Sequence, residues 1–300
     1  MKLADGPVFD AAPIGMFDSG VGGLTVARAL IDVLPDEHLI YVGDDARGPY
    51  GPRDLSEVHS IAFEITEWLI SAGSKLIVVA CNTAAAAALT DLQRAFDVPI
   101  IGVIEPGVRA ALKVAIGNKI GLAATSGTVK SGAYDAVLGR LHPGAELVSV
   151  SCPRFVEFVE RGETQGPEIA KLAETYLAPV RESAVESLVL GCTHYPLLAR
   201  VISDAVGRDV TLISSADETA FEVLDIGTRT GTLRYPMAED AVSGGPALRC
   251  FLSTGDPGVF ADLGRRFLGP EVTSVRRVDL GTEPGTVLEA WAGTLGLGDC

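Results

Sequence analysis

The chain has 300 residues, of which 47% are hydrophobic, so it is long enough for about two domains and can bury a large core. Its net charge of −15 repels phosphate backbones, which argues against extended contact with nucleic acid. The longest apolar stretch, 76–89, is interrupted by Asn82 and Thr83 and is too short for a membrane span, and the first 13 residues lack the apolar core of an export signal.

Short apolar runs typical of buried strands recur along the chain, with longer helix-like segments between them. The runs are 14–17, 39–42, 76–80, 100–103, 120–124, 146–150, 187–190, 210–213 and 248–252. Because parallel strands need long crossover connections, this alternation predicts an α/β fold with parallel sheets covered on both faces.

One segment between these runs, 54–72, has apolar residues at spacings of three and four, which predicts an amphipathic helix. Asp54 and Glu57 at its start have the spacing of a capping box. Gly73 stands where a helix C-terminus favours a left-handed residue. The sequence therefore predicts both ends of this helix.

The two halves of the chain carry similar motifs after corresponding strands. Cys81-Asn82-Thr83 has a counterpart 111 residues later in Cys192-Thr193-His194, and Asp18-Ser19-Gly20 has one 107 residues later in Thr125-Ser126-Gly127. Two similar offsets indicate a duplicated unit of ordinary domain size. The duplication predicts two equivalent sets of loops that face one another.

We therefore predict two pseudo-symmetric parallel-sheet α/β domains with a site in the cleft between them. Residues 1–105 together with 217–300 form the first domain, which is discontinuous, and residues 106–216 form the second. Ligands of open α/β sheets bind beyond the carboxyl ends of the strands, which is where Asp18, Thr125 and both cysteine motifs lie.

Cys81 and Cys192 are the strongest candidates for chemistry. A helix N-terminus can lower the pKa of a thiol from about 8.5 into the range of roughly 3.5 to 7.5, and the sequence predicts this placement for both residues. His194, two residues after Cys192, could set the protonation state of that thiol. The other cysteines, Cys152, Cys250 and Cys300, lack this context, and five cysteines do not suggest a disulfide framework. We expect reduced thiols in a cytoplasmic protein.

Other chemistries find little support in the sequence. The loop 18–23 could be mistaken for a dinucleotide fingerprint, but Thr25 occupies the position of the third glycine. The four histidines have no zinc-ligand spacing, and no lysine suited to pyridoxal phosphate lies in the cysteine motifs. We expect no metal and no cofactor. The turn 49–51, followed by Arg53, could instead close over a substrate with the ring and hydroxyl of Tyr50.

At these positions the sequence closely resembles the glutamate racemase family of the aspartate/glutamate racemase superfamily. The matching motifs are 17–25 (FDSGVGGLT), 43–51 (GDDARGPYG), 80–84 (ACNTA) and 190–196 (LGCTHYP). A departure is Asp45, where a threonine is commoner in the family.

The resemblance implies interconversion of L- and D-glutamate without a cofactor, with Cys81 acting on D-glutamate and Cys192 on L-glutamate. Asp18 would assist Cys81, and His194 with Glu160 would assist Cys192. Substrate contacts would come from Asp18, Ser19, Tyr50, Gly51, Asn82, Thr83, Thr125, Thr128, Thr193 and His194. The resemblance also implies a homodimer that supplies D-glutamate for peptidoglycan.

Three alternatives stay open. Aspartate racemases typically carry Cys-Thr-Glu at the second cysteine motif, where this chain has Cys192-Thr193-His194. This difference favours glutamate over aspartate as the substrate. Some members of the family inhibit DNA gyrase by direct contact, and such a protein–protein role would survive serine substitution of both cysteines. A redox role for Cys81 and Cys192 would show itself as a reversible disulfide during turnover, although Cys-x-x-Cys spacing is absent.

Overall fold

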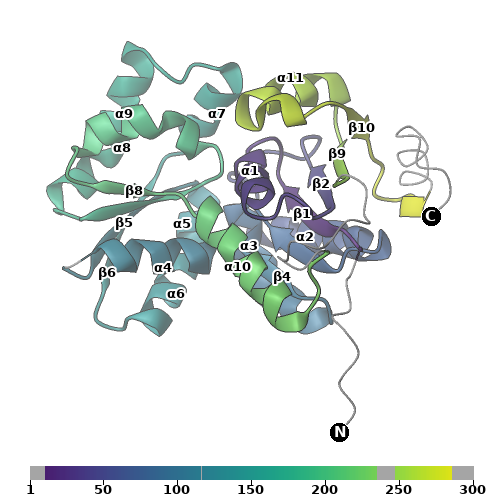
Figure 1. Ribbon diagram of the computed structural model, residues 1–300. Coiled ribbons are helices and arrows are strands. Elements are labelled where there is room, and N and C mark those ends of the chain that lie inside the picture. The colour runs from purple at the N-terminus through teal and green to yellow at the C-terminus, as the bar shows by residue number, and fades with distance from the viewer. Residues whose placement is uncertain (1–10, 116, 235–246, 286–300) are drawn as a thin grey trace, which may run out of the picture.

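The computed structural model describes residues 11–115, 117–234 and 247–285, which form two parallel β-sheets with helices packed on them (Figure 1). The first sheet has the strand order β10-β9-β2-β1-β3-β4 and the second has the order β6-β5-β7-β8. In the first sheet the strands are β1 (Ile14–Asp18), β2 (Leu39–Gly43), β3 (Leu76–Val79), β4 (Ile100–Gly102), β9 (Arg249–Ser253) and β10 (Val275–Arg277). In the second they are β5 (Lys119–Ala124), β6 (Glu146–Ser151), β7 (Ser187–Gly191) and β8 (Thr211–Ile213).

Helices connect and cover the strands. Those that follow strands of the first sheet, or return the chain to it, are α1 (Leu24–Val33), α2 (Leu55–Ser71), α3 (Asn82–Ala95), α4 (Ile104–Val114), α10 (Ala216–Thr230) and α11 (Pro257–Phe267). Those within the second part are α5 (Ser126–Ser131), α6 (Ala133–Leu141), α7 (Arg154–Arg161), α8 (Pro167–Glu182) and α9 (Ala199–Val206). Two 3₁₀ helices are η1 (Tyr195–Leu198) and η2 (Gly269–Glu271).

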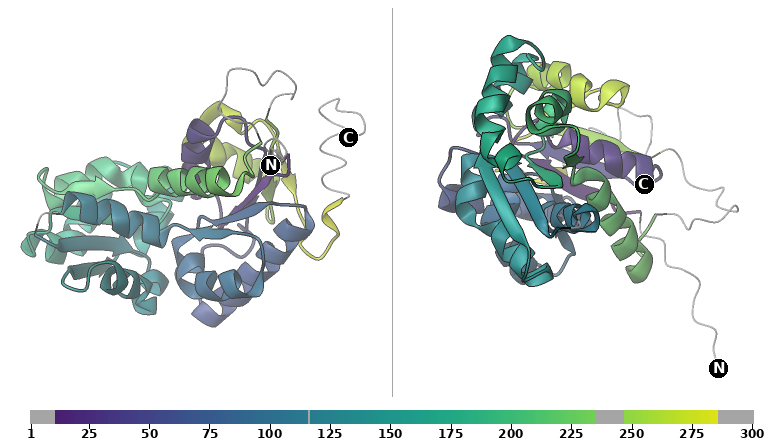
Figure 2. Two further views of the ribbon diagram at one scale, coloured as in Figure 1. Left: turned by 60° about the horizontal axis from the view of Figure 1, so that its bottom comes forward. Right: turned by 90° about the vertical axis from the view of Figure 1, so that its left-hand side faces the viewer.

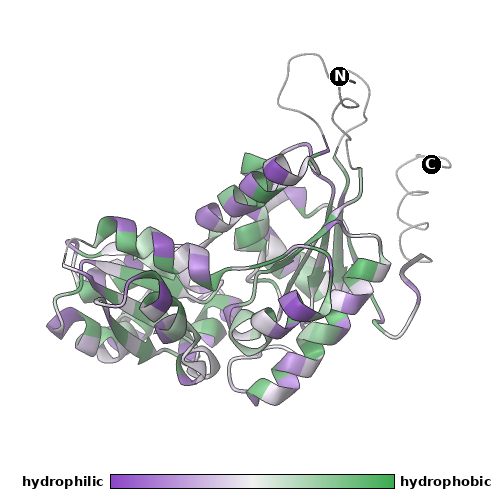
Figure 3. Ribbon diagram, turned by 90° about the horizontal axis from the view of Figure 1, so that it is seen from below, coloured by the Kyte–Doolittle hydropathy of each residue, from purple (hydrophilic) through white to green (hydrophobic). Residues whose placement is uncertain are grey.

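The first sheet is buried on both faces, as its continuous apolar strands require. In β3, Ile77 and Val79 belong to the core under α2 and α3, whereas Leu76 and Val78 belong to the core under α1 and α10. In Figure 3 the strands are mostly hydrophobic, whereas the helices mix hydrophobic with hydrophilic positions. Successive strand residues thus serve two separate cores.

The structure confirms the predicted fold class, and each of the nine predicted strands is present. Strand β10 was missed, because Val275-Arg276-Arg277 is short and polar and lies at the edge of the sheet. The predicted helix corresponds to α2, and Gly73 after it has the expected positive φ of 82°. The capping box is wrong: the Asp54 side chain makes no cap hydrogen bond, and Glu57 pairs with Arg53 instead.

The two sheets are built from different parts of the chain. Strands β5 to β8 all come from residues 106–216, and the other strands come from the segments before and after. The chain crosses to the second sheet at α4 and returns at α10, and these two helices contact each other (Figure 2). The boundaries stay a prediction, and residues 1–10, 116, 235–246 and 286–300 of the proposed domains lie outside the described structure.

Among the described residues, no helix combines the length and apolar character needed to cross a bilayer.

Candidate active site

A cavity of about 380 Å³ lies between the loops that follow the carboxyl ends of strands from both sheets. The first sheet contributes the loops after β1, β2 and β3, and the second contributes those after β5, β6 and β7. The lining residues are Ser19, Pro49, Tyr50, Gly51, Pro52, Cys81, Asn82, Thr83, Thr125, Ser126, Pro153, Val156, Glu157, Glu160, Cys192, Thr193 and His194.

The cavity brings together both candidate thiols and most of the residues singled out in the sequence. Two of those residues do not line it. Asp18 is fully buried beneath the cavity, and Thr128 is buried behind Thr83 and Thr125. These two side chains therefore face residues that line the cavity.

Cys81 lies at the N-cap position of α3, as predicted, and its side chain is buried. Burial raises its pKa to about 12, and the nearby charge of Asp18 adds to this effect. The hydroxyl of Ser19 and the backbone N–H of Ala84 favour the thiolate but do not offset burial. The expectation of a lowered pKa is thus wrong for Cys81, because desolvation outweighs the helix N-terminus.

Asp18 ends β1 and has no exposed surface. Its carboxylate accepts hydrogen bonds from the backbone N–H of Gly20 at 3.2 Å and from the Thr193 hydroxyl at 3.3 Å. Burial raises the pKa of Asp18 above its usual value, although these hydrogen bonds and the charge of His194 oppose the shift. Asp18 therefore connects the Cys81 side of the cavity to the Cys192 side.

Cys192 directly follows β7 but does not begin an α-helix, so its predicted placement is wrong. Thr193 and His194 intervene before the short helix η1, and α9 begins only at Ala199. Pro196 within η1 has no N–H to donate. The electrostatic partner of this thiol is therefore a side chain.

That partner is His194, whose Nδ1 lies 3.9 Å from the Cys192 sulfur. Its Nε2 lies 3.2 Å from Oε1 of Glu160 on α7. Burial alone would lower the pKa of His194, but the hydrogen bonds with Cys192 and Glu160 raise it to about 10. The imidazole is therefore protonated at neutral pH and places a positive charge beside the Cys192 sulfur.

The loop after β1 packs closely on the motif of Cys192. A Cβ atom added to Gly22 would lie 2.4 Å from Nδ1 of His194 and 2.4 Å from Oγ1 of Thr193, so only glycine fits. The Thr25 hydroxyl also donates to the carbonyl oxygen of Thr193 at 3.3 Å. The first sheet thus fixes the position of the second thiol's neighbours.

On the opposite side, three threonine hydroxyls join the two halves. Thr83 lies 3.0 Å from Thr125 and 3.2 Å from Thr128, and the last two are 3.0 Å apart. Gly51 approaches the same place, because its carbonyl oxygen accepts from the backbone N–H of Gly127 at 3.0 Å. A Cβ atom on Gly51 would lie 2.8 Å from that of Thr125, so a side chain there would push the loop outward.

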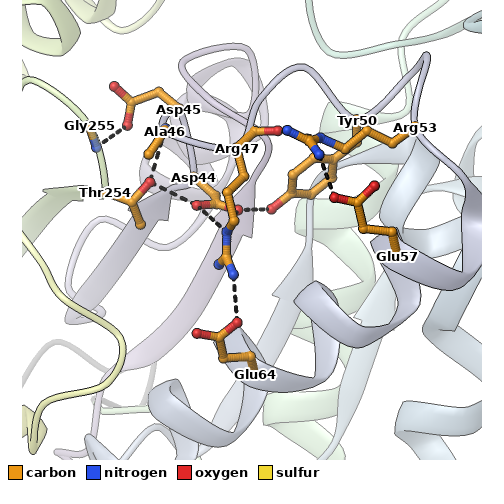
Figure 4. A network of polar contacts seen from close by, with 10 residues as sticks. All are labelled: Asp44, Asp45, Ala46, Arg47, Tyr50, Arg53, Glu57, Glu64, Thr254 and Gly255. Atoms are coloured by element: carbon orange, nitrogen blue, oxygen red, sulfur yellow. Dashed lines mark hydrogen bonds and ion pairs between the residues drawn. The ribbon is translucent and has the colours of Figure 1, made fainter.

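One expectation about the loop after β2 is wrong: the hydroxyl of Tyr50 donates to the Asp44 carboxylate and is not directed at the cavity. Arg53, which follows the turn, is bound to the carbonyl oxygen of Arg47 and to Glu57 (Figure 4). The ring of Tyr50 and the backbone at Gly51 are what this loop presents.

Several lining residues were missed in the sequence. The missed residues include Pro153, Val156 and Glu157. They share one helical face with Glu160, which was predicted, and α7 turns this face to the cavity. That periodicity was a usable signal once Glu160 had been singled out. Ser126 follows Thr125 as Ser19 follows Asp18, so the duplication also pointed to it.

The described lining residues include no lysine or arginine, and His194 is their one basic side chain. A carboxylate bound here would meet hydroxyl and amide donors, together with backbone N–H groups at the start of α3. Within the described residues, no group of three or more His, Cys, Asp and Glu side chains is placed to hold a metal ion.

Each of the two parallel α/β units contributes one thiol to a shared cavity. This arrangement is typical of an enzyme whose site is built by both halves of the chain. Residues 24–223 match the family model described as Asp/Glu/Hydantoin racemase. The chain belongs to the Asp/Glu/Hydantoin racemase family, which confirms the predicted fold and the predicted class of enzyme, a racemase.

Individual relatives agree with this membership. The chain is 51% identical to a glutamate racemase of Mycobacterium avium over 89% of this chain and 96% of the relative. A crystal structure of a glutamate racemase isoform from Bacillus anthracis has a TM-score of 0.82 and 42% identity, covering 90% of this chain and 98% of the other. A glutamate racemase from Francisella tularensis, solved in complex with D-glutamate, has a TM-score of 0.83 and 32% identity, covering 91% and 99%.

Proposed function

We propose that this chain is a glutamate racemase that interconverts L- and D-glutamate without a cofactor, with Cys81 and Cys192 as its two acid/base residues. The observation that carries the proposal is that both thiols line one cavity from opposite sheets. The names of the relatives, and the D-glutamate bound to one of them, support glutamate as the substrate. Aspartate racemases typically carry a Glu residue at the position of His194. The histidine therefore favours glutamate over aspartate as the substrate.

The reaction needs one thiolate and one thiol. The thiolate on one side removes the α-proton, and the resulting carbanion takes a proton from the thiol on the other side. After this turnover, the cysteine that removed the α-proton is the thiol and the other cysteine is the thiolate. A turnover in the reverse direction restores the starting form. Two thiolates would repel each other and a substrate that carries two carboxylates. We assign Cys81 to D-glutamate and Cys192 to L-glutamate.

The two sides differ in how the proton is managed. Near Cys81, a buried Asp18 with a raised pKa can hold a proton and return it to the thiolate. Near Cys192, the pair of His194 and Glu160 supplies a positive charge balanced by a carboxylate. These environments favour a resting form with Cys81 as thiol and with His194 protonated beside Cys192.

Neutral donors are expected to hold the substrate. Hydroxyls and amides of Ser19, Asn82, Thr83, Thr125 and Thr193 surround the cavity. Such donors stabilise the negative charge that develops on the substrate carboxylate when the α-proton leaves. The described lining residues include no lysine or arginine, so the substrate carboxylates are expected to bind to these neutral donors.

We extend the proposal to the setting of the reaction: a cytoplasmic homodimer that provides D-glutamate for peptidoglycan. The support is the family resemblance and the identity of about half of the residues to curated glutamate racemases.

The test is to incubate each enantiomer with the enzyme without added cofactor and to monitor racemisation by circular dichroism. Wild type is expected to racemise both, and Cys81→Ala and Cys192→Ala are expected to lose racemisation. In D₂O, Cys81→Ala should still exchange the α-proton of L-glutamate only, and Cys192→Ala that of D-glutamate only. Cys250→Ala is the matched control, because Cys250 is equally buried but lies in β9 outside the cavity. An inert wild type, or a single variant that still racemises, would contradict the proposal.

A further inference from the structure

A polar network connects the loop that carries Tyr50 to β9 and α2 (Figure 4), and of its residues only Tyr50 lines the cavity. Its centre is Asp44, whose side chain is completely buried. The Asp44 carboxylate accepts hydrogen bonds from the hydroxyl of Tyr50, from Nε of Arg47 at 2.8 Å and from the hydroxyl of Thr254 at 2.8 Å. Three donors thus converge on one buried charge.

The network ties the loop to a distant part of the chain. Thr254 follows β9 and also accepts a hydrogen bond from the backbone N–H of Ala46 at 3.1 Å. The neighbouring Asp45 accepts from the Ser253 hydroxyl at 2.7 Å and from the backbone N–H of Gly255 at 3.0 Å. The start of the loop is therefore anchored on the carboxyl end of β9.

A second anchor comes from Arg47. Its Nη1 pairs with Glu64 on α2 at 2.6 Å, while Nε pairs with Asp44. Asp44 is therefore held from two elements, β9 and α2, before it binds Tyr50. A carboxylate fixed in this way offers a pre-organised acceptor to the phenol.

From Tyr50 the chain reaches across to the second half of the molecule. Tyr50 is completely buried and lines the cavity with its neighbour Gly51. Gly51 accepts the hydrogen bond from Gly127 and lies against Thr125. The phenol bond to Asp44 lies just behind this closing contact, so its loss would free the segment to move off Thr125.

The bond between the two side chains is strong for a physical reason. Burial raises the pKa of Tyr50 well above its usual value, and the charge of Asp44 raises it further, so the phenol stays protonated and donates. Hydrogen bonds to ionised acceptors are about twice as strong as those between neutral groups. Removing the donor would also leave part of a buried carboxylate unsatisfied.

We propose that Asp44 is a positioning residue, which holds the Tyr50–Gly51 segment closed on Thr125 through the phenol of Tyr50 and so sets the affinity for substrate. Asp44 does not line the cavity and takes no part in proton transfer. The kinetic consequence rests on the proposed glutamate racemase function, whereas the closed position of the loop does not.

The proposal predicts a specific split between the kinetic constants. If only the closed loop binds substrate, the apparent affinity falls in proportion to the fraction of molecules in which the loop is closed. Saturating substrate then restores the closed loop. Loss of a hydrogen bond to a charged group corresponds to a rise in KM of about ten- to a hundredfold. The value of kcat should change less than about threefold, because the thiols are untouched.

The first experiment measures KM and kcat for Asp44→Asn, Tyr50→Phe and the double variant. Each single substitution should raise KM with little effect on kcat, since Asp44→Asn removes the charge that strengthens the bond and Tyr50→Phe removes its donor. The double variant should resemble the worse single one, because both substitutions act on the same bond. Glu57→Gln is the control, since it removes one carboxylate from the same region but touches only the exposed pair with Arg53. An unchanged KM, effects that multiply, or a loss confined to kcat would overturn the proposal.

The second experiment needs no substrate turnover. Hydrogen exchange followed by mass spectrometry reports the backbone N–H of Gly127, which the closed loop protects. Exchange of peptides covering 125–131 should be faster in Asp44→Asn and in Tyr50→Phe, and unchanged in Glu57→Gln. Unchanged exchange in both loop variants would overturn the proposal. Faster exchange in an enzyme that does not racemise glutamate would support the role of Asp44 and reject the proposed function.

Discussion

Gly22→Ala perturbs the contact between the loop after β1 and the motif of Cys192. The added Cβ would lie 2.4 Å from both His194 Nδ1 and Thr193 Oγ1, where ordinary contacts begin at 3.4 Å. His194 and Thr193 must therefore retreat by about 1 Å, or the loop must do so. Either movement separates His194 from Cys192, or Thr193 from Asp18.

The expected loss follows from this displacement. A shift of about 1 Å in a catalytic group costs about a hundredfold in rate, so we expect kcat/KM to fall by that factor. Overpacking should also reduce the free energy of unfolding by about 1 to 3 kcal/mol. The fold should survive, because the contact involves side chains at the edge of a cavity and not a closed core.

Racemisation by circular dichroism and urea unfolding measure the two effects. Gly20→Ala is the matched control in the same loop, because a Cβ there meets no atom within 4 Å. It should keep nearly full activity and stability. If Gly22→Ala and Gly20→Ala had kcat/KM values within about threefold of each other, the close approach would not govern the site and the reasoning would be refuted.

Substitutions at three further positions test the charges and hydroxyls around the cavity. Asp18→Asn should stabilise the fold by about 1 kcal/mol at pH 7 in urea unfolding while it reduces racemisation, because it removes a fully buried charge. The raised pKa of His194 contributes stability that is complete below about 6.5 and is lost as pH rises through about 10. Glu160→Gln should shift this loss of stability to lower pH. The shift should be modest because Glu160 is partly exposed, and urea unfolding measured from pH 6 to about 10.5 would show it. Thr125→Val should cost about 1 kcal/mol by removing the N-cap of α5, and Thr125→Ser should restore stability and KM.

Much of the fold could be predicted because the determinants are local. Continuous apolar runs mark the strands of a sheet buried on both faces, and the duplicated motifs mark corresponding strand ends. Cys81 and Cys192 follow from the same logic, since each lies beyond the carboxyl end of a strand in its own sheet and the duplication makes these two positions equivalent. The strand β10 lacked an apolar run and was missed for that reason.

The rest depended on contacts between residues far apart in the chain. No local pattern shows that Thr254 binds Asp44, or that Asp44 takes up the phenol of Tyr50. The pKa of Cys81 was mispredicted in direction, because a helix N-terminus can be seen in sequence and the depth of burial cannot. Glu160 came from family resemblance, and its contact with His194 required the packing of α7 against η1.

The difference between the two thiols bears on how substrate enters. Burial raises the pKa of Cys81 to about 12, and protonated His194 lies beside Cys192. If Cys81 is the base for D-glutamate, as proposed, binding of that enantiomer must lower the pKa of this thiol, and a positively charged ammonium group close to the sulfur would do so. The two enantiomers have equal free energy in water, so kcat/KM must be equal in both directions whatever this asymmetry. The asymmetry is then visible only in kcat and KM taken separately, and in the rates at which each enantiomer exchanges its α-proton with solvent.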